Sequence, residues 1–147
     1  MSADEALPEV WVSFDFFGAT FDPDAITARL GIEPTSAHRT GDPIKEDKGR
    51  WPRDRWRITI GPKNTIEIGD MLTDLLARLA PAEGALSQVC IENRVEPMIT
   101  CAVEPNSATT PYILFPENVV KWSARHDVAI AVDVMLWREN DADADDD

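Results

Sequence analysis

The feature that most constrains this chain is a long basic segment, residues 34–56, with no helix or strand periodicity. Compact domains rarely contain structureless connections longer than about 12–15 residues unless they are binding loops or disordered. Trp51 and Trp56 argue against disorder, because tryptophan side chains are mostly buried. Residues 39–57 also contain half of the chain's fourteen Lys and Arg residues. We therefore expect an ordered loop that carries a binding site.

Length and composition indicate one soluble domain. The 147 residues are 44% hydrophobic, enough for a core that needs neither a disulfide nor a metal ion. We expect a flexible N-terminus over residues 1–8, a domain over residues 9–138 and a disordered acidic tail over residues 139–147. Residues 1–8 lack the features of a secretion signal, and no apolar run approaches the roughly 18 residues of a membrane span. The sequence thus predicts a cytoplasmic protein with no membrane partner.

The net charge of −13 limits the classes of partner. It disfavours the phosphate backbone of nucleic acids and favours cationic proteins. The arginines and tryptophans of residues 50–57 resemble a nucleic-acid stacking surface, but the charge argues against that interpretation.

Motifs of enzymatic chemistry are scarce. The chain contains no phosphate-binding glycine loop, no His-Glu-x-x-His and no Gly-x-Ser-x-Gly. Its two cysteines lack metal-ligand spacing, and His126 ends an expected helix, where a cation suits the dipole. We expect neither a cofactor nor a metal ion, and favour a non-enzymatic protein.

Local patterns predict the elements. Hydrophobic residues alternate along residues 9–18, so that Val10, Val12, Phe14 and Phe16 form the core face of a strand. A helix over residues 22–30 is capped by Asp22 and starts with Pro23. Further helices are expected over residues 65–80 and 116–126, and further strands over residues 56–61, 87–94, 98–104 and 128–137.

A hairpin is expected between residues 87 and 104. If it turns at Val95-Glu96, Cys90 lies directly opposite Cys101 on the neighbouring strand. In a reducing cytosol both would remain free thiols.

The predicted fold class is α+β. One two-layer domain would contain a mixed, mostly antiparallel sheet of about five strands with helices on one face. The order β-α-β-α-β-β-α-β corresponds to a ferredoxin-like unit, starting at Trp56, with an added N-terminal β-α.

Alternation also predicts what lies on the helix-free face of the sheet. Asp15, Asp133 and Trp137 fall there, and we expect the basic loop to fold across part of that face and pair its cations with the two acids. Paired carboxylates for acid–base chemistry are the alternative interpretation of Asp15 and Asp133. The remaining candidate ligand or partner contacts come from the loop: His38, Arg39, Asp42, Lys48, Trp51, Arg55 and Trp56.

Three short motifs resemble those of one known family. They are Phe-Asp-Pro at residues 21–23 with Leu-Gly-Ile-Glu-Pro-Thr at 30–35, Gly-Asp at 41–42 followed by Trp51 and Trp56, and Val-Asp-Val at 132–134. The chain is similar over nearly its whole ordered length to the bacterial family called domain of unknown function 4279. The resemblance implies a small bacterial cytoplasmic domain and a link to toxin–immunity genes, without an established activity. Leu136-Trp137 departs from the tyrosine that such domains commonly carry there.

Two functions of different classes remain. We favour a non-enzymatic binding protein that neutralises a basic protein partner through its acidic surface, as an immunity-type inhibitor of a toxin does. The alternative is a small-ligand or anion-binding domain that uses the 34–56 loop, with Arg39, Lys48 and Arg55 around the anion. An enzyme ranks third. Either binding protein could be a monomer or a homodimer.

Overall fold

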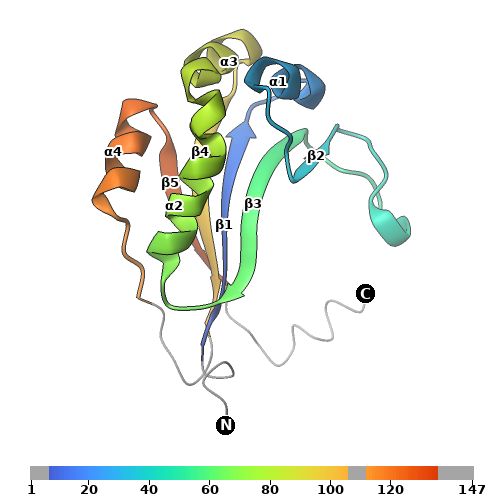
Figure 1. Cartoon of the computed structure of the whole chain (residues 1–147). Helices are drawn as coiled ribbons and strands as arrows, with labels where there is room; N and C mark the ends of the chain where they lie inside the picture. Colours follow the sequence, from blue (N-terminus) through green and yellow to red (C-terminus); the bar gives the residue numbers. More distant parts are fainter. Residues whose placement is uncertain (1–6, 106–111, 136–147) are drawn as a thin grey trace.

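The computed structural model describes residues 7–105 and 112–135, which form one five-stranded sheet with helices packed on one face (Figure 1). The elements are β1 (Glu9–Phe17), α1 (Pro23–Leu30), β2 (Ser36–His38), the 3₁₀ turn η2 (Lys45–Asp47), β3 (Arg55–Asn64), α2 (Ile68–Leu79), the 3₁₀ segment η3 (Ala80–Ala85), α3 (Leu86–Asn93), β4 (Glu96–Glu104), α4 (Glu117–Arg125) and β5 (Ala129–Val134). The α+β class and the five-stranded mixed sheet are as predicted. No helix in these two stretches is long and apolar enough to cross a membrane.

The strand order is β2-β3-β1-β4-β5. All neighbouring strands are antiparallel except β4 and β5, which are parallel. The segment from β1 to β4 therefore has the β-α-β-β-α-β connectivity of a ferredoxin-like unit, with α3 inserted before its last strand. Its position differs from the prediction: the unit starts at β1, and the added pair, α4 and β5, follows it.

The predicted strand over residues 87–94 is wrong, because these residues belong to helix α3 and the turn after it. Leu86 and Val89 are buried one helical turn apart, and α3 packs against η3 and α1. Cys90 therefore lies on a helix and Cys101 on β4, so the two do not face each other across a hairpin; both are free. The fifth strand is instead β2, inside the segment expected to be irregular.

The core lies between the sheet and the helices. As the alternation predicts, Val10, Val12, Phe14 and Phe16 are at most 2% exposed. They face the apolar stripe of α2, whose buried members are Ile68, Met71, Leu72, Leu75 and Leu79. This stripe is thus core rather than a partner groove.

The start of α1 forms as its sequence predicts. The Asp22 carboxylate accepts a hydrogen bond from the Asp24 amide at 3.0 Å, and Pro23 occupies the first turn. Gly31, with a φ of 74°, ends the helix in the left-handed conformation.

Several predicted features lie outside the described residues. They are Trp137, the acidic tail over residues 139–147, and the first six residues of the expected flexible N-terminus. Pro8 is described, and its carbonyl accepts a hydrogen bond from the Thr65 amide at 3.1 Å.

Gly61 provides a test of the sheet geometry. It has a φ of 111°, and a Cβ there would lie 2.7 Å from the Val10 carbonyl oxygen, beside the irregular register of β1 between Val10 and Val12. We expect Gly61→Ala to lower the free energy of unfolding by about 1–3 kcal/mol, because it adds both backbone strain and a clash. Chemical denaturation measures the change.

The matched control is Gly84→Ala, since a Cβ at Gly84 meets nothing within 4 Å and its φ is not positive. A Gly61→Ala protein as stable as the Gly84→Ala protein would contradict this account of the close contact between Gly61 and Val10.

Candidate functional site

A cavity of about 720 Å³ lies on the helix-free face of the sheet, at the end where β1 stops and β3 and β4 begin. Four arginines line it: Arg53, Arg55, Arg57 and Arg94. We call it the arginine cavity. Strand pairing explains its floor: Asp15 lies opposite Arg57, and Arg55 opposite His38, so all four project from the same face.

The loop over residues 39–54 is ordered, as predicted, and its last four residues form the outer wall of this cavity. Its two arms pair, with the Gly41 amide donating to the Trp51 carbonyl at 2.8 Å and the Trp51 amide to the Asp42 carbonyl at 2.9 Å. In Figure 1 the loop extends sideways beyond β2. It does not lie across the sheet as expected; only its last part, around Trp51 to Asp54, reaches the cavity.

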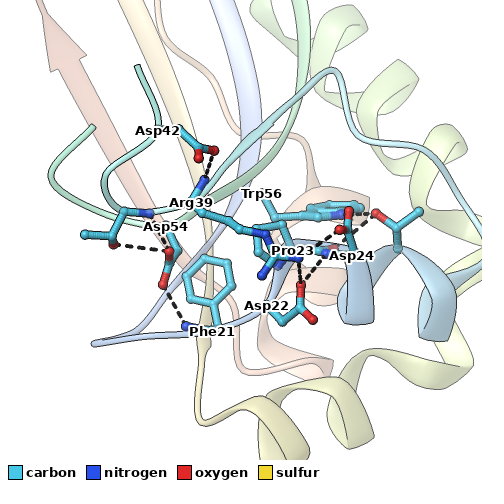
Figure 2. A network of polar contacts seen from close by, with 10 residues as sticks. Phe21, Asp22, Pro23, Asp24, Arg39, Asp42, Asp54 and Trp56 are labelled. Carbon is cyan, nitrogen blue, oxygen red and sulfur yellow. Dashed lines mark hydrogen bonds and ion pairs between the residues drawn. The ribbon is translucent and has the colours of Figure 1, made fainter. Parts of the chain in front are cut away.

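Asp54 attaches this loop to the start of α1 (Figure 2). Its carboxylate accepts hydrogen bonds from the amides of Phe21 and Thr40, at 2.9 and 2.7 Å, and from the Thr40 hydroxyl at 3.1 Å. Burial alone would raise the pKa of Asp54, but the bonds from Thr40 and Phe21 outweigh it and hold this pKa below its ordinary value. One carboxylate therefore joins two segments distant in sequence.

Arg39 and Asp42, both predicted binding residues, take part in the same attachment. The Arg39 guanidinium pairs with Asp22 at 2.5 Å and with Asp24 at 2.8 Å, and its amide donates to Asp42 at 2.7 Å (Figure 2). Their polar groups are directed to α1 and to the turn of the loop, and neither residue lines the arginine cavity.

An aromatic stack stands at the side of the cavity. The rings of His38 and Trp51 are parallel within 9°, with centroids 4.0 Å apart, and the Arg55 guanidinium carbon lies 5.5 Å from the Trp51 ring. Burial, and then the charge of Arg55, lower the pKa of His38 below its ordinary value. His38 is therefore neutral at pH 7 and serves as a flat packing surface.

Asp15 and Arg57 form a buried ion pair. The Arg57 Nε lies 2.5 Å from an Asp15 carboxylate oxygen, and the Asp15 side chain is only 3% exposed. The Ser13 hydroxyl donates to the other carboxylate oxygen at 3.5 Å. The partner of Asp15 thus comes from β3 itself rather than from the loop.

Arg55 is the cation that this arrangement leaves available. It is half-buried and makes no ion pair with any residue of the described part of the chain. Burial lowers its pKa, and the neighbouring Arg57 lowers it further, whereas Asp15 acts in the opposite direction. A guanidinium in such surroundings is stabilised by an incoming anion.

The other predicted residues lie elsewhere. Trp56 is fully buried in the core, where its indole Nε1 donates to the Thr27 hydroxyl at 3.0 Å. Lys48 is exposed near Glu46, 3.9 Å away. Asp133 on β5 pairs with Ala102 on β4, which in turn pairs with Trp11 on β1. Trp11 is four residues from Asp15 along β1, so the two acids do not form a carboxylate pair.

The prediction missed Arg53 and Arg94. Arg94 ends α3 in the left-handed conformation, with a φ of 54°; the incorrect strand at residues 87–94 concealed this position. Within residues 7–105 and 112–135, no group of three or more His, Cys, Asp or Glu side chains could hold a metal ion.

Comparison with known families identifies the family of this chain. The family described as "Domain of unknown function (DUF4279)" matches residues 8–137. The chain belongs to this family. Neither the curated proteins nor the solved structures provided a match. Membership confirms the resemblance of the motifs, and the matched range includes every described residue except Leu7.

Asp54→Ala tests the attachment of the loop. We expect faster hydrogen exchange at the amides of Phe21 and Thr40, because each loses its acceptor. In the unsubstituted protein the same change should appear only on acidification below about pH 4: the lowered pKa of Asp54 means that its stabilisation is present at neutral pH and lost as the carboxylate gains a proton.

Asp47→Asn is the control, since Asp47 is an exposed acid at the end of η2 in the same loop and asparagine tolerates its φ of 56°. Equal exchange rates in the two variants would show that Asp54 does not hold the loop.

Proposed function

We propose that this protein is a non-enzymatic binding domain whose ligand is a small anion held in the arginine cavity. The observation that carries the proposal is Arg55: it is half-buried, stands beside the Trp51 ring and lacks a carboxylate partner in the described part of the chain. A planar guanidinium with free donors suits the bidentate recognition of a carboxylate or phosphate.

The surroundings support an anion rather than a cation. Arg53 and Arg94 line the same cavity, and the charge of Asp15 is compensated by Arg57. Two more acids line it: the oxygens of Asp54 already accept hydrogen bonds from Phe21 and Thr40, and Glu96 is an exposed acid at its boundary. A local group of cations can attract an anion even in a protein with a net charge of −13, because charges farther than about 8 Å are screened at physiological salt.

Arg55→Ala tests this function. We expect inorganic phosphate and benzoate to bind the unsubstituted protein, and the variant to lose roughly tenfold or more in affinity, as for one charge-assisted hydrogen bond. Isothermal titration calorimetry measures the affinity, and circular dichroism confirms the fold. Lys63→Ala removes an exposed cation from the far end of β3 and should bind as before.

An equal loss of anion affinity in both variants would indicate a general effect of net charge. Absence of anion binding to the unsubstituted protein would overturn the proposal.

A second candidate function is capture of a basic protein partner, as by an immunity-type inhibitor. It is supported by the excess of acids and by a row on α2: Glu67, Asp70 and Asp74 are all exposed and spaced along one side of the helix. This row lies on the side of the molecule opposite the arginine cavity, so the two functions can be tested separately.

Salt dependence distinguishes this second function. We expect a basic partner captured from cell extract to be released as ionic strength rises from 0.05 to about 0.5 M, because exposed charge pairs are screened. Substituting Asp70 and Asp74 by Asn should weaken capture, whereas Arg55→Ala should not. Capture that persists at high salt would argue against an acidic docking surface.

A further inference from the structure

We propose that the anion is amphipathic, with its charged group at Arg55 and an apolar chain lying in a second cavity beside the first. This inference rests on the proposed anion-binding function and adds the class of ligand. It comes from the continuity of two cavities across one end of the sheet.

The second cavity has a volume of about 730 Å³ and lies between α3, the end of α4 and the starts of β4 and β5. Much of its lining is apolar. Ile91 is 69% exposed and Phe17 39% exposed, although both are large hydrophobic residues. The other apolar residues of the lining are Cys90, Val95, Pro97, Met98 and Ala129.

The two cavities meet at Phe17 and Glu96, which line both. These two residues are directly opposite each other on β1 and β4. From Arg55 on β3 the path crosses β1 and β4 and reaches Ala129 on β5, which is paired with Met98. Three strand spacings of about 4.8 Å make this path roughly 14 Å long, the length of an extended chain of about eleven carbon–carbon bonds.

The charges of the second cavity determine which end of the ligand lies in which cavity. Asp127 is an exposed acid that lines the second cavity alone, whereas the exposed Glu96 stands at the boundary of both, so an anionic group is disfavoured beyond this boundary. The two basic side chains of that cavity are directed to Glu83: His126 Nε2 lies 2.8 Å and Arg125 3.5 Å from its carboxylate. Burial, aided by Glu96, raises the pKa of the Cys90 thiol, so this side chain is neutral at pH 7.

A series of linear alkyl phosphates tests the inference: methyl, butyl and octyl phosphate, below the concentration at which the octyl compound aggregates. Calorimetry should show affinity rising with chain length, by up to about fourfold for each methylene that becomes buried. Octyl phosphate should bind at least tenfold more tightly than methyl phosphate.

Ile91→Gln changes an exposed position of the second cavity without disturbing the core. We expect it to lower the affinity for octyl phosphate several-fold and to leave the affinity for methyl phosphate unchanged. Val120→Gln is the matched control, since Val120 is 49% exposed on α4 and does not line either cavity. It should change neither affinity.

The outcomes separate this inference from the proposed function. If all three phosphates bind equally and Arg55→Ala weakens each of them, the anion site stands and the apolar extension is wrong. If octyl phosphate binds Arg55→Ala as tightly as the unsubstituted protein, or if none of the three binds, both proposals are overturned.

Discussion

The alternation of side chains along β3 is the constraint on which the rest of the site depends. Trp56 points to the helices, where it is fully buried, contacts Phe16 with ring centroids 5.4 Å apart and donates to Thr27. Because successive side chains of a strand point to opposite faces, Arg55 and Arg57 must then project from the helix-free face. The core therefore positions the cations. A shift of β3 by one residue would turn the arginines toward the helices and Trp56 toward the helix-free face.

Two neighbouring arginines on one face have different roles because only one has a partner. Arg57 is aligned with Asp15, and their contact compensates a carboxylate that is almost completely buried. Arg55, two residues earlier, is aligned with neutral His38 instead. The pair of Asp15 and Arg57 is structural, and the charge available to a ligand is that of Arg55.

The parts of the fold that depend on residues close together in the sequence could be predicted from it. The alternation of β1, the cap of α1 and the stripe of α2 are examples. The segment with Val89 and Ile91 could not, since its β-branched residues favour a strand locally and it becomes helical where Leu86 and Val89 pack on α1 and η3. In the candidate site, the composition of the loop predicts His38, Trp51 and Arg55, and all three line the arginine cavity. It does not predict Arg94, because the position of Arg94 depends on helix α3. Asp133 and Asp15 are separated by the strand order, in which β4 lies between their strands and which alternation does not determine.

The left-handed backbone of Arg94 has a consequence for engineering this domain. Glycine occupies that conformation with less strain than any residue with a side chain, so a helix end of this kind is a standard place to gain thermal stability. Here the gain would remove a guanidinium from the cavity wall. A laboratory selection for heat resistance alone would therefore favour a more stable protein with one cation fewer around the proposed anion site.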